Sequence, residues 1–275
     1  MKPLLPTVKF GDTDITRLII GGNPFSGNSH VSSAMDREME TYFTTANMKK
    51  ALFDCMENGI NTMQLRADRH ILRLMHEFRC DGGKLHWIAQ TASEMSLEVN
   101  VPMIRKGGAV AVYHHGSVTD SLYQAGEIAQ LRSRLDMMRT LDIPLGLGTH
   151  IPEVVHRAEE ENWGVDFYMT CLYNLSKQDR ISSAITGISN QDEPFDEEDR
   201  DIMLETVRRV DKPCLVFKIL GATRRCATPE DVRAAFAEAY RGMKPIDAGI
   251  VGMYPKDSDQ VAENAEIVRA LCQGE

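Results

Sequence analysis

The sequence lacks the features of secreted and membrane-spanning proteins. Its six cysteines include no C-x-x-C pair, and no apolar run reaches the length of about 18 residues that suggests a membrane-spanning helix. The first six residues contain two prolines and are too short for the apolar segment of a signal peptide. We therefore expect a reduced, cytoplasmic protein with free thiols and no membrane partner.

An excess of basic residues is also missing. Lys and Arg number 31 against 40 Asp and Glu, so the formal net charge is −9. Nucleic-acid phosphates favour a basic surface, and this acidic balance argues against a nucleic-acid partner. The 275 residues, 43% of them hydrophobic, are enough to bury a large core. We expect a single domain that binds a small-molecule substrate, and both a monomer and a homo-oligomer are open alternatives.

The sequence does contain a regular alternation of strand and helix patterns. Segments with apolar residues at helical spacing, such as 48–57, 121–141 and 229–240, separate eight short β-rich runs. Those runs are 18–21, 62–65, 86–90, 109–114, 145–148, 166–172, 214–219 and 248–251. Eight β–α units in this order predict an α/β fold, a single (β/α)8 TIM barrel over residues 1–275.

Local signals refine this prediction. Thr228 followed by Pro229 and two acidic residues is typical of a helix start, and Gly59 after Asn58 is typical of a helix end. Residues 7–15 form two short strand patterns around a Gly-Asp turn, which predicts an N-terminal β-hairpin that plugs one end of the barrel.

Two connections are longer than a barrel needs. Residues 26–47 follow the first predicted strand, and residues 176–195 follow the sixth. Both begin at the carboxyl end of a strand, so both would overhang the mouth of the barrel. Substrate lids and surface insertions used in oligomer contacts are both open interpretations.

The segment 251–264 suggests an anion site. It contains the end of a strand, a glycine turn and a helix expected to open at Asp257 or Ser258, with Lys256 just before that opening. Free backbone N–H groups and the helix dipole favour a negative charge there. The last unit of a (β/α)8 barrel often binds a phosphate at this place.

Several of these segments together resemble the aldo-keto reductase superfamily. They are the N-terminal hairpin, the stretch Leu18-Ile-Ile-Gly-Gly-Asn, the run 57–61 before the second strand, Leu172-Tyr-Asn and the closing Gln260-Val-Ala-Glu-Asn. The resemblance implies an NADP(H)-linked oxidoreductase that acts on a small polar carbonyl or polyol, sugar-like compound. By the same resemblance, the adenosine phosphate end of NADP would contact Lys256, Asp257, Gln260 and Asn264, with Arg224 adding positive charge nearby. An ordinary solvated helix face is the other interpretation.

The family's catalytic tetrad of Asp, Tyr, Lys and His is largely replaced. The matching positions carry Gln64 for Asp, Arg69 or His70 near Tyr, Gln90 for Lys, and His114 or His115 for His. A tyrosine with an ordinary pKa of about 10 protonates a carbonyl near neutral pH only when cationic neighbours tune it. Reduction by the standard tetrad is therefore unavailable.

The expected nicotinamide contacts are changed as well. Thr149 and His150 stand where the family has Ser-Asn, and Thr170 stands in place of Gln. The exchange weakens the case for NADP(H) as a hydride donor.

Polar and basic residues concentrate at the predicted strand ends. The candidate catalytic residues are His115, His150, Lys218, Gln64 and Gln90, and the candidate substrate-binding residues are Asn23, Arg66, Arg69, Thr170, Tyr173 and Asn174. Since His114 and His115 are consecutive, one of them must point away from the mouth, and we favour His115 as the inward one.

Several roles are open for these residues. His115 is a candidate acid and base on a carbonyl or hydroxyl, with Arg66 or Arg69 binding a carboxylate or phosphate of the substrate. Lys218 is a candidate Schiff-base amine or general base, or else a partner of a nearby carboxylate. His115 and His150 are candidate ligands of a divalent metal, with Glu94, Asp120 or a water completing the site. The alternatives to a reductase are a non-redox lyase, isomerase or hydrolase, and a non-catalytic ligand-binding barrel.

Overall fold

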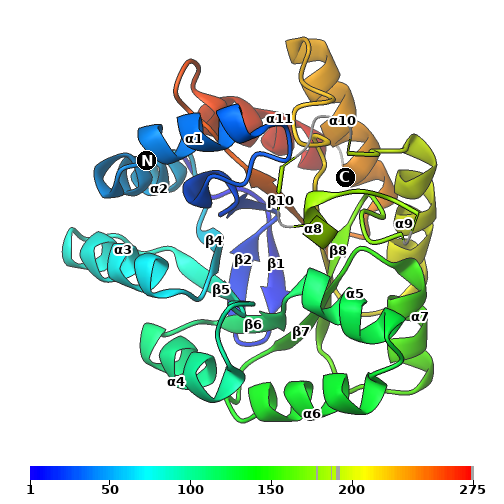
Figure 1. The fold of residues 1–275 in the computed structure, drawn as a ribbon. Helices are drawn as coiled ribbons and strands as arrows, with labels where there is room; N and C mark the ends of the chain where they lie inside the picture. The colour runs from blue at the N-terminus through cyan, green and yellow to red at the C-terminus, as the bar shows by residue number, and fades with distance from the viewer. Residues whose placement is uncertain (178, 187, 190–192, 274–275) are drawn as a thin grey trace.

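Eight parallel strands close into a barrel in the computed structural model, which describes residues 1–177, 179–186, 188–189 and 193–273 (Figure 1). Around the barrel the order is β10-β3-β4-β5-β6-β7-β8-β9. The strands are β3 (Leu18–Gly21), β4 (Thr62–Arg66), β5 (His86–Gln90), β6 (Ala111–His114), β7 (Leu145–Thr149), β8 (Phe167–Cys171), β9 (Cys214–Phe217) and β10 (Ala248–Gly252). The predicted (β/α)8 TIM barrel is confirmed.

Helices surround this barrel (Figure 1). They are α1 (Ser33–Tyr42), α2 (Thr45–Glu57), α3 (Arg69–Cys80), α4 (Leu97–Gly107), α5 (Gly116–Gln124), α6 (Ile128–Arg139), α7 (Pro152–Glu160), α8 (Ser183–Thr186), α9 (Glu197–Arg209), α10 (Pro229–Gly242) and α11 (Gln260–Cys272), with a 3-10 turn at η1 (Pro24–Ser26). The prediction of one helical segment over 121–141 is wrong. Gly126 takes a left-handed φ of 74° after α5, and this residue separates α5 from α6.

The predicted N-terminal hairpin is confirmed as β1 (Thr7–Phe10) paired antiparallel with β2 (Thr13–Thr16). Its apolar side chains Val8, Phe10 and Ile15 belong to the same buried cluster as the inward-facing residues of the barrel strands. Phe10 meets Phe167 of β8 edge to face, with 4.7 Å between the ring centroids. The hairpin therefore closes the amino end of the barrel and leaves the carboxyl end as its mouth.

Two buried layers hold the fold together. The inner layer lies inside the barrel, and the larger outer layer lies between the strands and the helices. The cysteines are free, and Cys171 and Cys214 are buried in this interior as expected. Among the described residues, no helix is both long and apolar enough to cross a membrane.

The predicted helix signals are confirmed at both kinds of helix end. The Thr228 side chain accepts a hydrogen bond from the backbone N–H of Asp231, and the Asp231 carboxylate accepts one in return from the backbone of Thr228. Gly59, with a left-handed φ of 83°, follows α2, and its carbonyl accepts a hydrogen bond from the Leu5 N–H. This last contact ties the N-terminal segment to the end of the helix.

Gly59 and Gly82 offer a matched test of this packing, since both follow a helix in a left-handed conformation. A Cβ at Gly82 meets no atom within 4 Å, whereas one at Gly59 would lie 2.2 Å from the Pro3 carbonyl oxygen. We expect Gly82→Ala to lose about 1–2 kcal/mol of stability through backbone strain alone. Gly59→Ala should lose clearly more, measured as a larger fall in the thermal unfolding temperature. Equal falls in the two variants would contradict the close packing of residue 3 on α2.

Candidate active site

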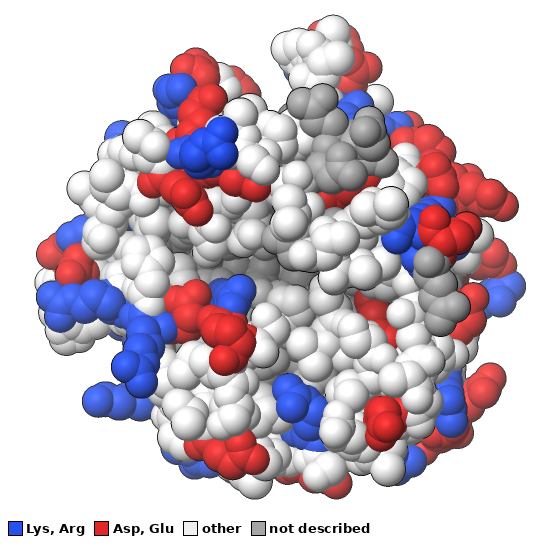
Figure 2. All heavy atoms as spheres, viewed as in Figure 1, with Lys and Arg blue, Asp and Glu red and all other residues white. Residues whose placement is uncertain are grey.

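Glutamine and tyrosine side chains of β4, β5 and β6 face the interior of the barrel below its mouth. Gln64 lies opposite Ile88 in the β4–β5 ladder, and Ile88 belongs to the inner layer, so Gln64 faces the interior. Gln90 lies opposite Tyr113 and forms a hydrogen bond with it. The molecule is hollowed near the centre of the face shown in Figure 2, and most of the surface around the hollow is uncharged. Hydrogen-bonding groups without net charge therefore form the floor of the site.

The structure separates the roles of the two consecutive histidines. His114 is fully buried outside the barrel, where its Nδ1 lies 2.8 Å from Thr119 Oγ1 and its Nε2 accepts a hydrogen bond from Arg134 Nε, also at 2.8 Å. His115 follows Tyr113 by two residues on the inward side, as we favoured, and its Nδ1 is buried with no hydrogen-bond partner in the described chain. His114 is therefore structural, and His115 faces the mouth.

Burial also keeps both rings neutral. It lowers the pKa of His114 to about 3, assisted by the positive charge of Arg134. It lowers the pKa of His115 to about 4, assisted by the positive charge of Arg66. His115 is therefore a neutral hydrogen-bonding group at physiological pH, and is poorly suited to carry a proton.

His150 is held by a buried carboxylate. Its Nδ1 lies 2.7 Å from Asp120 Oδ2, and its backbone N–H donates to the same oxygen at 3.1 Å. The Asp120 carboxylate also accepts hydrogen bonds from the hydroxyls of Thr149, at 2.5 Å, and Ser176, at 2.6 Å. The acceptor at Nδ1 fixes the proton on that nitrogen and leaves Nε2 as the basic atom of the ring.

This arrangement differs from a nucleophilic Ser-His-Asp triad. In such a triad the serine bonds to Nε2 and the carboxylate to Nδ1. Here Ser176 Oγ lies 3.4 Å from His150 Nδ1, on the same side of the ring as Asp120. Ser176 and Asp120 therefore position His150, and the structure gives no activated serine at this place.

Lys218 lies directly after β9 in a left-handed conformation, with a φ of 62°. Such a backbone is unfavourable for a residue with a side chain, and strain of this kind concentrates at functional sites. Within the described chain no carboxylate lies in ion-pair distance of its Nζ, which sits 5.6 Å from the centroid of the Phe195 ring. Burial lowers the pKa of this amine to about 8.

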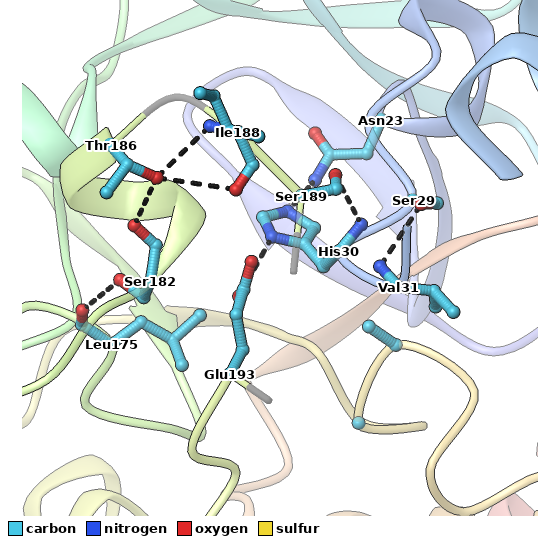
Figure 3. Close-up of polar contacts among 12 residues, drawn as sticks. Asn23, Ser29, His30, Val31, Leu175, Ser182, Thr186, Ile188, Ser189 and Glu193 are labelled. Carbon is cyan, nitrogen blue, oxygen red and sulfur yellow. Dashed lines mark hydrogen bonds and ion pairs between the residues drawn. The ribbon is translucent and has the colours of Figure 1, made fainter. Parts of the chain in front are cut away.

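The two long loops meet above the mouth, which agrees with the predicted overhang (Figure 3). The His30 ring lies 3.4 Å from Glu193 Oε2 on one side and 3.2 Å from the Asn23 amide on the other. The His30 backbone N–H donates to Ser189 Oγ at 3.1 Å. Burial lowers the pKa of His30 to about 4, and the charge of Lys218 adds to this effect. The loops are therefore joined across the site by a neutral histidine.

Arg66 enters the mouth from the end of β4. Its Nη2 pairs with the Glu94 carboxylate, and Asp68 Oδ2 lies 3.8 Å from its Nε. The Nε itself is buried and makes no hydrogen bond within the described residues. The Nε–H of this guanidinium therefore has no acceptor at hydrogen-bond distance among the described residues.

The candidate cofactor residues lie around the start of α11. Lys256 is exposed and pairs with Glu38 at 2.7 Å, and the Gln260 side chain accepts a hydrogen bond from the backbone N–H of Tyr254. The expected helix opening at Asp257 or Ser258 is wrong. The helix begins at Gln260, because the Asp259 carboxylate caps it by accepting from the Ala262 N–H at 3.0 Å. Asp257 is exposed and Asn264 is buried.

Arg224 is held by the loops. Its Nη1 donates to the His30 carbonyl at 2.9 Å, and its guanidinium lies over the Phe195 ring at 3.9 Å from the centroid. It therefore joins the loop after β9 to the loops after β3 and β8.

The other residues predicted to bind substrate differ in their burial and in their hydrogen-bond partners. Asn23 reaches the loop histidine, while Arg69 is exposed at the first residue of α3. Tyr173 is buried with its hydroxyl accepting from Arg200 at 3.3 Å. Thr170 Oγ1 and Asn174 Oδ1 are buried without a hydrogen-bond partner in the described chain. Arg66 and Asn23 therefore contact other residues of the mouth and its loops, and Tyr173 and Asn174 lie just after the end of β8.

The His115 and His150 pair does not gather a metal-ligand set. Among the described residues, no group of three or more His, Cys, Asp and Glu side chains has a geometry that could hold a metal ion. The Asp120 carboxylate, one of the expected third ligands, is bonded to His150 instead. The hypothesis of a divalent metal at this site is therefore supported by the two histidines, His115 and His150, and by no third ligand among the described residues.

Sequence reasoning missed Ser176, His30 and Glu193 as site residues, and it treated Asp120 only as a metal ligand. No spacing links these residues to their partners, since Ser176 lies 56 residues from Asp120 and 26 from His150. The one available signal was the position of the two long loops after strand ends.

Comparison with known proteins identifies the fold and no family. No family model matches the chain, and no curated protein matches it. Among solved structures, it is similar to the aldo-keto reductase AKR11C1 from Bacillus halodurans in its holo form, with a TM-score of 0.61 at 10% identity, covering 98% of this chain and 96% of that one. It is also similar to a truncated 3-deoxy-D-arabino-heptulosonate 7-phosphate synthase from Thermotoga maritima, with a TM-score of 0.58 at 14% identity, covering 98% and 92%.

A third similar structure widens the range of chemistries. The dihydropteroate synthase of Yersinia pestis matches with a TM-score of 0.53 at 8% identity, over 98% of each chain. The protein is therefore a TIM barrel of the kind found in enzymes, and the aldo-keto reductase likeness is one of several distant ones. The fold alone does not select among their reactions.

The neutral state of His114 predicts how stability depends on pH. An unfolded histidine takes up a proton below a pH of about 6.5, whereas the folded His114 does so only near 3. The folded state thus binds fewer protons in between, and stability falls as the pH is lowered from 6.5 towards 4, by about 1.4 kcal/mol per pH unit for this residue.

Denaturant unfolding of wild type and His114→Asn across this pH range measures the effect. The variant should show a slope of stability against pH that is shallower by about 1.4 kcal/mol per unit, whatever its stability at neutral pH. The exposed His70 supplies the control His70→Asn, which should keep the wild-type slope. An unchanged slope in His114→Asn would show that His114 is protonated in the folded state.

Proposed function

We propose that the protein is a non-redox enzyme, a lyase or isomerase, that acts on a small polar carbonyl compound through the amine of Lys218. The observation that carries the proposal is Lys218 itself. This amine lies beneath the mouth loops with no carboxylate in ion-pair distance in the described chain, and burial lowers its pKa to about 8. A barrel places its reactive groups at the carboxyl ends of strands, as this lysine is placed.

An amine with this pKa is reactive near neutral pH. About a tenth of the molecules carry the neutral amine at pH 7, whereas an ordinary lysine, with a pKa of about 10.4, has well under a hundredth. The neutral amine can add to a carbonyl carbon, and the adduct takes up a proton and loses water to give an iminium ion. The iminium then withdraws electrons from the neighbouring carbon, which eases removal of a proton or cleavage of a bond there.

His150 supplies the second role, that of acid and base. Its ring packs edge to face against Phe217, the residue before Lys218, with 5.7 Å between the ring centroids. Asp120 holds the proton on Nδ1, so Nε2 can accept a proton from the substrate and return it. In this proposal Lys218 is the nucleophile, His150 is the acid and base, and Asp120 and Ser176 position His150.

The glutamines fit a polar substrate. Gln64 and Gln90 replace the acidic and basic members of the reductase tetrad and provide amide groups at the floor of the mouth. An amide both donates and accepts hydrogen bonds, so it suits the hydroxyls of a sugar-like compound. These groups support substrate binding and supply no proton-transfer chemistry of their own.

Trapping of the iminium tests the proposal. Wild-type protein incubated at pH 7 with dihydroxyacetone or glycolaldehyde and cyanoborohydride should gain mass on the peptide that contains Lys218. Lys50 provides an internal control, because its ion pair with Asp54 raises its pKa. We expect Lys218 to be labelled at least about a hundredfold faster than Lys50. Its labelling rate should rise with pH up to about 8 and then level off.

Two variants separate the roles in this test. Lys218→Arg keeps the positive charge and should abolish labelling at this position, while His150→Asn should leave labelling intact and slow any turnover. Labelling of Lys218 no faster than that of Lys50 would overturn the proposal.

The second candidate is an NADP(H)-linked reductase, and the likeness of fold to a holo aldo-keto reductase favours it. Two contacts weigh against it, namely the Lys256–Glu38 ion pair and the capping of α11 by Asp259. Both place a carboxylate where the cofactor phosphate would bind.

Fluorescence titration with NADPH distinguishes the two candidates. On our proposal, no saturable binding occurs up to millimolar NADPH, and Lys256→Glu changes nothing. Lys2→Glu is the matched control, since Lys2 also forms an exposed ion pair, with Glu266. Saturable binding that is weakened by Lys256→Glu and not by Lys2→Glu would favour the reductase.

A further inference from the structure

Two polar atoms at the mouth are buried without hydrogen-bond partners. Within the described chain, neither Arg66 Nε nor His115 Nδ1 makes a hydrogen bond. Burial lowers the pKa of His115, and the charge of Arg66 adds to this effect. Buried polar atoms in native proteins are nearly always hydrogen-bonded, so a pair left open at the mouth of a barrel indicates a place for ligand atoms.

Carboxylates more than offset the positive charge at these two side chains. The guanidinium of Arg66 pairs with Glu94, and Asp68 lies 3.8 Å from its Nε. His115 is neutral above a pH of about 4. The pair therefore offers directed hydrogen bonds with no net positive charge, and two carboxylates beside it would repel a phosphate.

The other place where a barrel commonly binds phosphate is also occupied by carboxylates. Glu38 accepts hydrogen bonds from Lys256, at 2.7 Å, and from the Tyr254 hydroxyl, at 3.0 Å. The N-terminus of α11 is capped by Asp259. The N-terminus of α11 and the Lys256 ammonium, which would both attract an anion, thus already interact with carboxylates of the protein.

We infer that the substrate is an unphosphorylated polyhydroxy carbonyl compound whose hydroxyls bind at Arg66 Nε and at His115 Nδ1. This inference rests on the proposed function and names its substrate class. A hydroxyl accepts a hydrogen bond from Arg66 Nε–H, which only donates, and it can donate to or accept from His115 in either tautomer. A phosphate oxygen would bring a charge that Glu94 and Asp68 disfavour.

Binding to matched pairs of ligands tests the substrate class. Calorimetric titration of Lys218→Ala, which cannot form the covalent adduct, uses D-fructose, D-arabinose and D-glucose against their terminal phosphate esters, with inorganic phosphate as a further probe. We expect at least one free sugar to bind at least tenfold more tightly than its ester. The inference is overturned if esters or inorganic phosphate bind as tightly as the free sugars, or if no free sugar binds.

Deoxy sugars and Arg66→Lys test the position of the hydroxyl. Lysine keeps the charge and loses the Nε–H donor. For the tightest sugar of the panel, we expect Arg66→Lys to weaken binding about tenfold, while Arg73→Lys, an exposed arginine on α3 that pairs with Glu77, leaves it unchanged. One deoxy analogue should lose about tenfold in affinity with Arg66 present and less than threefold in Arg66→Lys. Equal losses in both backgrounds would show that Arg66 does not bind the hydroxyl.

The two proposals fail in different ways. Free sugars that bind tightly without any trapping at Lys218 would remove the proposed reaction and keep the substrate class. Trapping at Lys218 with sugars that bind only as phosphate esters would keep the reaction and remove the substrate class.

Discussion

The pairing of β10 with β3 closes the sheet, and the site depends on that closure. The two strands run parallel with Gly249 opposite Leu18 and Gly252 opposite Gly21, although they lie at opposite ends of the chain. Closure places every strand end in one ring, and the N-terminal hairpin seals the other end. Polar side chains from β4 to β9 therefore meet above a packed interior. Electrostatic interactions are stronger there than in water because the local dielectric constant is lower. The lowered pKa of Lys218 is a consequence of that environment.

The sequence predicts this architecture well because strands and helices have local signatures. Each predicted strand ends within two residues of the observed one, and the Thr228 and Gly59 signals lie at helix ends as expected. It predicts Lys218, His115 and His150 as mouth residues because strand ends define the mouth. The partners were not predictable, since Asp120 and Ser176 reach His150 through the folded arrangement of a helix and a loop. No local sequence pattern indicates that the Asp120 carboxylate forms a hydrogen bond with the His150 imidazole.

The resemblance to aldo-keto reductases shows that a similar fold does not imply the same reaction. An aldo-keto reductase is among the similar structures, at 10% identity, which shows a likeness of fold alone. At the positions that the sequence resemblance assigns to catalysis the chain has the amides Gln64 and Gln90, and Lys256 pairs with a carboxylate of the protein. The groups that remain at the mouth suit carbonyl chemistry through an amine and an imidazole. The proposed reaction therefore depends on Lys218 and His150 and does not follow from the fold.

The central claim is that Lys218 is a lysine with an unusually acidic ammonium group. Its titration can be followed directly by NMR of protein with 15N-labelled lysine side chains, with the Lys218→Ala variant used to assign the signal. The account predicts a midpoint at a pH of about 8. A midpoint at about 10.4, the ordinary value for lysine, would contradict it.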